Sequence, residues 1–374
     1  MRSTITRRSL FNLCLLSILF ASIDEPIRVC ALRVSFAEDD FSSTTGNGDF
    51  LLLNDGIDCG IYTIDPPPHN KEYFESQLEA VHYYFNNISY GKFGLDIINS
   101  KVFPDNSESN YKLDNYMNYY NPYDNFELQE QRITELFRDA LLKAYGEDQI
   151  NFSDYDIIVI FHAGIGQDFS LPFLDPTPED IPSTYVDQSM IQSHLGEQSI
   201  IVGGNVINHG ILLPESQNHL LYDISQTMFS DAMNPCDYQF GLTGTFALMV
   251  GFAIGLPPLW NVDTGESGIG VFGLMDQGSN NSNGIIPAPP NAWSRIYANW
   301  ETPYTVEYGN QVILPKRSEN KIVKVPLRDN EYFLIENRSN YVRDGVSLDS
   351  IRYLMGQMSI EETYPSFIEI LFDS

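Results

Sequence analysis

The stretch that decides the fold is residues 248–260, which read LMVGFAIGLPPLW. Together with the residues just before it, this stretch forms a run without charged side chains over residues 245–256. A surface helix would carry polar residues along one face, so the pattern predicts a helix that is buried on all sides. The residues Gly255-Leu256-Pro257 close the run, because glycine favours the end of a helix and proline cannot continue one.

Short motifs occur in a fixed order on both sides of this run. Residues 273–279 read GLMDQGS, and residues 287–296 read PAPPNAWSRI. The upstream motifs are TTGNG, DPPPH, SYGK, VFPD, HAG and LPE, at residues 44–48, 65–69, 89–92, 102–105, 162–164 and 213–215. Each motif alone is weak evidence, but their order together is specific.

In these motifs the chain resembles the immune-inhibitor-A family of secreted bacterial zinc metallopeptidases, over roughly residues 27–340. The zinc-binding helix of that family reads H-E-x-x-H-x-x-G-L-P, and a Leu-Met-Asp turn and an Ala-Trp-Ser-Lys/Arg segment follow it. The resemblance implies an α+β fold of the zincin-like type, with a mixed sheet and an active-site helix. It also implies that Met275 is the methionine of the family's Met-turn.

The chain departs from the family at the catalytic positions. In the family's motif two histidines four residues apart bind one zinc ion, and the glutamate beside the first activates the zinc-bound water. Aligned on the Gly-Leu-Pro end, Leu248 and Phe252 stand at the histidine positions and Met249 at the glutamate position. Pro258 lies in the region of the third ligand. These side chains neither bind zinc nor transfer protons, so we expect a filled apolar core, no zinc and no catalytic residues.

The remaining candidate ligands do not restore a metal site. No pair of the six histidines has the spacing of two ligands on one helix face. His209 and His219 flank residues 213–215 and could meet in space, but we interpret them as loop histidines. The loops 175–180 and 261–266 contain oxygen ligands that calcium accepts, without EF-hand spacing. We expect solvated acidic loops there, with calcium binding as the alternative.

Charge and targeting patterns limit the partners and the location. The chain has 50 acidic and 21 basic residues and a net charge of −29, which repels nucleic acid and anionic membranes. Residues 1–23 combine three arginines with an apolar run too short to span a membrane comfortably, so they read as a signal peptide. No later stretch is apolar enough to cross a membrane. We therefore predict a secreted or periplasmic protein without a membrane anchor or nucleic-acid partner, able to bind peptide or protein.

The cysteines outside the signal peptide allow at most one disulfide. Cys59 and Cys236 lie in loop-like contexts and could pair, and Cys30 reads as a small buried hydrophobic residue in a strand.

Residue periodicity places the expected elements along the chain. It predicts helices at 71–88, 127–145, 245–256 and 291–300, strands at 27–36, 95–103, 156–161 and 199–203, and an irregular loop at 171–186. Strand patterns return at 311–314, 321–325, 332–336 and 367–372. We therefore expect a metallopeptidase-like domain at 24–302, followed by a smaller β-rich region at 303–374, which the resemblance implies is truncated relative to the family.

Three functions are compatible with this pattern. The leading hypothesis is a catalytically inactive relative of a secreted metallopeptidase, which binds peptide or protein. The alternatives are an active zinc endopeptidase whose ligands lie outside the alignment, and a secreted adhesion or interaction protein that binds through its β-rich region.

Overall fold

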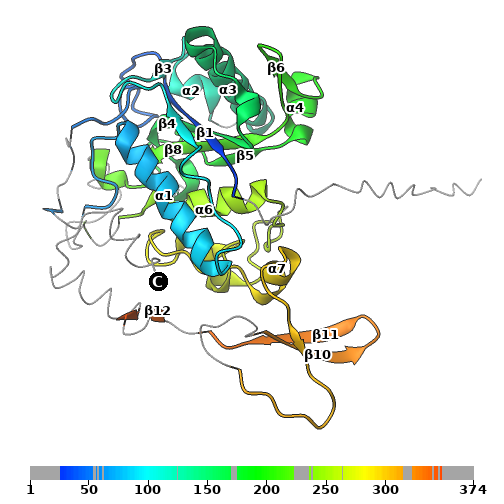
Figure 1. The fold of residues 1–374 in the computed structure, drawn as a ribbon. Coiled ribbons are helices and arrows are strands. Elements are labelled where there is room, and N and C mark those ends of the chain that lie inside the picture. Colours follow the sequence, from blue (N-terminus) through cyan, green and yellow to red (C-terminus); the bar gives the residue numbers. More distant parts are fainter. Residues whose placement is uncertain are drawn as a thin grey trace, which may run out of the picture.

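The structure, a computed structural model, describes residues 26–53, 56, 59–60, 63–123, 125–169, 175–222, 236, 239–262, 264–314, 322–338, 341–343 and 346–347. It is α+β, as predicted: a mixed sheet with helices on its faces is followed by a separate small β-sheet (Figure 1). The predicted signal peptide and the predicted strand at 367–372 lie outside the described residues.

The helices and strands follow one another in this order: β1 (Val29–Ser35), α1 (Lys71–Ile88), β2 (Lys101–Phe103), β3 (Tyr111–Lys112), α2 (Met117–Tyr120), α3 (Phe126–Asp148), β4 (Ile157–Ile165), β5 (Thr184–Val186), α4 (Gln188–Leu195), β6 (Ile200–Val202), β7 (Asn205–Ile207), β8 (Gly210–Ser216), α6 (Leu242–Ala253), α7 (Ala292–Tyr297), β9 (Tyr304–Thr305), β10 (Ile322–Arg328), β11 (Glu331–Glu336), β12 (Tyr341–Arg343) and β13 (Val346–Ser347). Short 3₁₀ helices include η4 (His219–Tyr222), η6 (Gly270–Phe272) and η7 (Gln277–Asn280).

The main sheet is parallel except at one edge. Its described strands run in the order β2-β1-β4-β8-β5, and β3 also pairs with β1. The β1–β2, β1–β3, β1–β4 and β4–β8 pairs are parallel, whereas β5 is antiparallel to β8. Every residue of β1 and β4 is buried, which agrees with the nearly continuous apolar runs of both segments.

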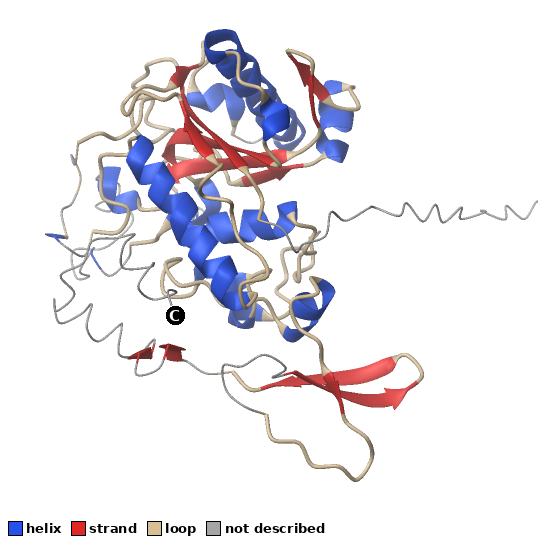
Figure 2. Ribbon diagram, viewed as in Figure 1, coloured by secondary structure: helices blue, strands red, loops and turns tan. Residues whose placement is uncertain are grey.

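Helices cover both faces of this sheet (Figure 2). On one face α1 and α6 meet β4 through aromatic rings: the centroid of Phe161 lies 4.5 Å from that of Phe74 and 5.5 Å from that of Phe246. On the other face α3 packs against β1, and the ring of Phe137 reaches the backbone of Gly210 in β8. A Cβ at Gly210 would lie 2.4 Å from that ring, so the position requires glycine.

Several predicted elements differ from the observed ones. The strand predicted at 95–103 is confirmed only at Lys101–Phe103, and Leu95 forms an isolated bridge with Ile27. Residues 311–314 are not a strand. The predicted irregular loop at 171–186 is wrong at its end, because Thr184–Val186 forms β5. Strand β8 had no counterpart among the predicted strands.

A buried ion pair joins the small sheet to the main body. Arg295 in α7 is 1% exposed and donates to Glu301 and, at 2.5 Å, to Glu336 at the end of β11. Arg338 also binds Glu336 and donates to the carbonyl of Phe272. The sheet β9–β10–β11 is thereby fixed to the main body immediately after the predicted boundary near residue 302.

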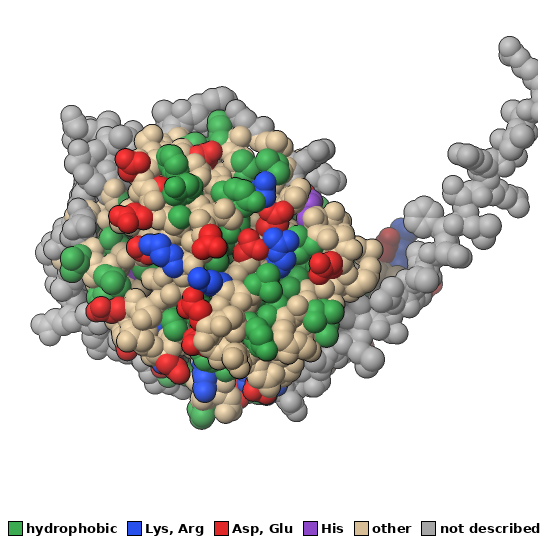
Figure 3. All heavy atoms as spheres, turned by 90° about the horizontal axis from the view of Figure 1, so that it is seen from above, with side chains coloured by type: hydrophobic (Ala, Val, Ile, Leu, Met, Phe, Trp, Pro, Cys, Tyr) green, Lys and Arg blue, Asp and Glu red, His purple; other side chains and the backbone are tan. Residues whose placement is uncertain are grey.

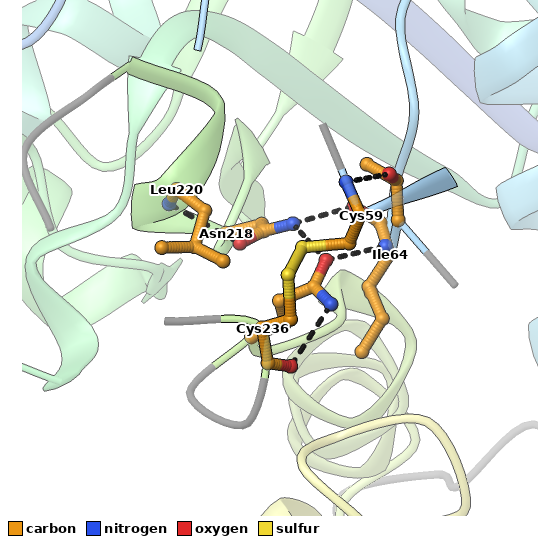
Figure 4. Close-up of a disulfide and its surroundings, with 7 residues drawn as sticks. Cys59, Ile64, Asn218, Leu220 and Cys236 are labelled. Carbon is orange, nitrogen blue, oxygen red and sulfur yellow. Dashed lines mark hydrogen bonds between the residues drawn. A yellow bond between two sulfur atoms is a disulfide. The ribbon is translucent and has the colours of Figure 1, made fainter. Parts of the chain in front are cut away.

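Of the pairings that the sequence leaves open, the structure has Cys59–Cys236, with a Cα–Cα distance of 5.9 Å (Figure 4). Cys30 is buried and free. The described part of the chain has no helix that combines the length and apolar character needed to cross a bilayer.

We predict that this disulfide makes a large contribution to stability, because the cysteines are 177 residues apart in sequence. In the chain-entropy model such a cross-link is worth about 5 kcal/mol. Urea unfolding should show a loss of several kcal/mol in the Cys59→Ala/Cys236→Ala variant. As a control, a reductant should lower the stability of the natural chain and leave the double variant unchanged; equal stability of the oxidised chain and the variant would contradict the prediction.

Candidate functional site

Helix α6 and the turn at residues 273–279 pack directly against each other. Met275 is fully buried, and a Cβ at Gly251 would lie 2.6 Å from the Met275 sulfur. A Cβ at Gly244 would lie 2.0 Å from the carbonyl oxygen of Ser279. The two glycines therefore let the turn approach the helix closely, and the structure places Met275 beneath the helix that carries the catalytic positions of the resembled family.

The carboxylate of Asp276 organises this turn. One of its oxygens accepts hydrogen bonds from the Ser267 hydroxyl and from the backbone N–H groups of residues 268, 269 and 270, at 2.8–2.9 Å. The other accepts the N–H of Gln277 at 2.8 Å. Burial raises the pKa of Asp276, but these donors outweigh it and hold the pKa below its ordinary value. The Asp276 carboxylate therefore accepts five hydrogen bonds from the protein, and these bonds hold the turn together.

The three positions aligned with the catalytic residues have different environments. Met249 is 7% exposed and belongs to the core, whereas Leu248 and Phe252 are only partly buried. The prediction of a helix buried on all sides, with a filled core at these positions, is therefore wrong for Leu248 and Phe252. Helix α6 therefore leaves part of its apolar surface, at Leu248 and Phe252, accessible to solvent.

Phe252 belongs to a half-buried group of aromatic rings. Its ring stacks on Tyr185 of β5, with centroids 6.4 Å apart and planes at 25°, and meets Trp260 edge-on at 5.7 Å. The ring centroid of His209 lies 6.1 Å from that of Tyr185. We call Tyr185, Phe252 and Trp260 the aromatic site. Phe252 and Trp260 come from the end of α6 and the loop after it, and Tyr185 comes from the edge strand β5, which is distant from them in sequence.

The aromatic site lies at the edge of the main sheet. Among the described strands, β5 pairs on one side only, through Thr184–Leu212, Tyr185–Ile211 and Val186–Gly210. Within the described residues, no strand pairs with the other side of β5, and an edge strand of this kind can accept an added strand. Helix α6 contacts both β5 and β8, so this edge and the end of α6 form one surface.

Three other motifs, at residues 65–69, 162–164 and 213–215, meet in a buried polar network. Glu215 of β8 accepts hydrogen bonds from Leu51 N–H at 2.8 Å, Gly164 N–H at 2.6 Å, the Tyr222 hydroxyl at 2.5 Å and His69 Nδ1 at 2.5 Å. The side chains of His69 and Glu215 are fully buried. Residues that the sequence presents as separate motifs thus converge on a single carboxylate.

Asp65 extends this network to the start of α6. Its carboxylate accepts the N–H of Leu242, the first residue of the helix, and the Ser216 hydroxyl, both at 3.0 Å. Gln77 also donates to it at 3.0 Å. Burial raises the pKa of Asp65 to about 6 despite these donors and the nearby His69. The DPPPH motif therefore holds α6 in place.

His69 is doubly protonated in this network. Its Nδ1 faces the Glu215 carboxylate and its Nε2 lies 2.8 Å from the carbonyl of Asp65, so both ring nitrogens face acceptors and both must donate. Burial lowers the pKa of His69, but the hydrogen bond to Glu215 and the charge of Glu215 outweigh burial and leave the pKa raised. The result is a buried imidazolium–carboxylate pair with a structural role.

The other candidate ligands lie apart or bind protein groups. His162 is fully buried and faces the Ala163 carbonyl at 2.9 Å; burial lowers its pKa to about 4. In the loop 175–180, Asp180 accepts from Thr45 N–H at 2.6 Å and Asp175 accepts from Thr177 N–H at 3.0 Å. Within the described ranges, no three His, Cys, Asp or Glu side chains come together as a metal site.

Comparison with known proteins gives no match to a protein-family model and no match to a curated protein.

Sequence reasoning found Leu248, Met249, Phe252 and Met275 but missed the partners that make Phe252 part of a surface. Tyr185 lies in the stretch 171–186, which the sequence predicts to be an irregular loop, and Trp260 is the last residue of the stretch 248–260. Neither residue carries a local signal of its role, because the contact depends on how β5 pairs with β8.

We predict a graded effect of alanine at three helical glycines. Gly244→Ala should cost about 3 kcal/mol, because the new methyl group would meet backbone; Gly251→Ala should cost less, because the flexible Met275 side chain can move. Gly146→Ala in α3, where a Cβ meets nothing within 4 Å, should stabilise by about 0.5–1 kcal/mol. Urea unfolding of the three variants measures the order of their free energies of unfolding. An unchanged free energy of unfolding in Gly244→Ala would contradict the close packing.

We also predict that stability falls as the pH rises above neutrality. The raised pKa of His69 means that its contribution is fully present below about pH 6.5, the ordinary value for histidine, and is lost as the pH rises through the folded-state pKa. His69→Gln should cost about 3 kcal/mol at pH 6, because Glu215 then stays buried without its charged partner. Urea titrations at pH 6–9 should show a flatter pH dependence in the variant; an unchanged slope would rule out the charged pair.

Proposed function

We propose that this chain is a secreted, zincin-like protein without metallopeptidase activity, which binds extended peptide or protein segments at the aromatic site. The proposal combines the resemblance of the motifs to the immune-inhibitor-A family with the replacement of the zinc ligands and the general base by Leu248, Phe252 and Met249. Leucine, phenylalanine and methionine at these positions supply neither the nitrogen and oxygen ligands of zinc nor a base for water.

The observation that carries the proposal is the position of Phe252. It stands where the second zinc-binding histidine of the family would stand, and its ring is shared with Tyr185 and Trp260 at the sheet edge. A core residue would be sealed from solvent, whereas Leu248 and Phe252 are both partly exposed. Aromatic side chains that remain accessible in a group are typical of binding surfaces.

The edge strand β5 supports an extended ligand. No described strand pairs with the outer side of β5, so an added strand can pair there while its side chains alternate between the aromatic site and solvent. The backbone pairing would provide affinity with little sequence preference, and the three rings would select apolar side chains.

Two features support the secreted location. Residues 1–23 have the pattern of a signal peptide. The disulfide Cys59–Cys236 is of a kind that persists outside the reducing cytoplasm.

The absence of zinc chemistry has a direct test. Purified protein equilibrated with zinc and then dialysed should contain far less than one zinc per chain, and casein cleavage should be undetectable with or without chelator. Stoichiometric zinc together with chelator-sensitive proteolysis would overturn the proposal in favour of an active endopeptidase with other ligands.

The binding function has a second test, which uses a matched pair of variants. Labelled decapeptides with alternating apolar and polar residues should bind, and Phe252→Ala should weaken the binding about tenfold, as expected for a central aromatic contact. The control is Phe103→Ala, which removes a partly buried ring from β2 at the opposite edge of the same sheet. Equal effects of the two variants in fluorescence anisotropy would contradict the assignment of the aromatic site.

A further inference from the structure

A second group of exposed aromatic rings lies away from α6, on the segments 37–43 and 114–123. Phe41, Tyr116, Tyr119 and Tyr123 are 40%, 45%, 36% and 61% exposed. The carboxylates of Glu38, Asp40 and Asp114 are exposed on the same two segments. We call these seven residues the tyrosine surface. Figure 3 looks down on the end of the molecule that carries α3, and shows hydrophobic, acidic and basic side chains interleaved there.

The residues at 116–120 divide their side chains between the core and the surface. Residues 116–120 read YMNYY, and the short helix α2 buries Met117 and Tyr120 in the core. Tyr116 and Tyr119, three residues apart, therefore share the outer face. The apolar residues needed for packing are already supplied by Met117 and Tyr120, so core packing does not account for the two outer rings.

Contacts between three separate segments keep the surface in shape. Ala37 N–H donates to the Asn115 carbonyl at 3.0 Å, and the Phe41 ring meets Tyr116 edge-on at 5.3 Å. Glu179 N–H donates to the Ser43 carbonyl at 2.9 Å, and the Glu179 carboxylate accepts the N–H of Tyr123 at 3.4 Å. A surface held in this way can bind a partner without first being ordered.

A contact within the protein shows that one of these rings binds a guanidinium group. The guanidinium of Arg132 lies over the Tyr119 ring, 3.9 Å from its centroid. A planar cation on an aromatic face is favourable, and a nearby carboxylate strengthens it: Glu135 lies 2.5 Å from Arg132. Tyr116 and Phe41 present the same kind of ring beside Asp40 and Asp114.

The charges around the surface are unbalanced. Lys112 and Arg132, the basic residues on the neighbouring stretches of chain, already pair with Asp49 at 3.2 Å and with Glu135. Within the part of the chain that the structure describes, Glu38, Asp40 and Asp114 have no ion-pair partner. Nucleic acid and anionic membranes are repelled by this charge, so a cationic protein segment is the fitting partner.

We propose that the tyrosine surface docks an arginine-rich segment of a partner protein, whose guanidinium groups stack on Phe41 and Tyr116 and pair with Asp40 and Asp114. Arginine is preferred to lysine because its planar group stacks on rings and pairs with carboxylates at the same time. This binding is independent of the aromatic site on α6 and β5.

The test measures anisotropy of a labelled decapeptide of alternating glycine and arginine, and of its lysine counterpart, at about 50 and about 200 mM salt. The full chain should bind the arginine peptide several-fold more tightly than the lysine peptide at both salt concentrations. Phe41→Ala/Tyr116→Ala should weaken arginine binding about tenfold, from the loss of two cation–aromatic contacts. Its control is Tyr304→Ala/Tyr308→Ala, which removes two exposed rings elsewhere and should change nothing.

If the ring variant does not fold, two double variants with the same change of charge test the proposal instead. Asp40→Asn/Asp114→Asn and Glu108→Gln/Glu197→Gln each remove two exposed carboxylates, and only the first pair belongs to the tyrosine surface. The first should weaken binding several-fold more than the second. Equal losses in both pairs, or equal affinity for the two peptides, would mean that net charge alone attracts the probe and would overturn the proposal.

Discussion

The carboxylate of Glu215 is the contact on which the rest of the structure depends. It is fully buried at the end of β8 and accepts four hydrogen bonds, from a loop before α1, from the end of β4, from η4 and from His69. An isolated buried carboxylate would cost several kcal/mol, so these donors must all be in place when the chain is folded. Through the Asp65 carbonyl that His69 binds, and the Asp65 carboxylate that binds Leu242 N–H, the same network fixes the start of α6.

The same hydrogen bonds hold three of the sequence motifs together. The DPPPH, HAG and LPE motifs supply His69, Gly164 and Glu215, which bind one another and need no metal. The Leu-Met-Asp turn is likewise held by Gly251 packing and by the five donors on Asp276. None of these hydrogen bonds involves the side chain of Leu248, Met249 or Phe252. The residues that hold the motifs together are therefore different from the three that align with the catalytic positions of the resembled family.

The sequence predicted the elements with strong periodicity and missed those set by pairing. Helix α1 and strand β1 follow from local pattern, and the α+β class follows with them. Strand β8 was missed because Pro214 argues against a central strand. The structure tolerates Pro214 because the β4–β8 register shifts directly after it and because β5 pairs only as far as Leu212. Strand β5 has three residues, too few for a periodic signal, so the aromatic site could not be assembled from sequence.

Leu248 and Phe252 differ from Met249 in how far they are buried. Close packing seals Met249, whereas Leu248 and Phe252 keep part of their surface in contact with water. A ring that is only partly buried gains less free energy from burial than a core residue does, and Phe252 shares this partial burial with Tyr185 and Trp260. Leu248 and Phe252 therefore pack against the core on one side and reach the surface on the other, and the proposed binding of a peptide segment rests on this geometry.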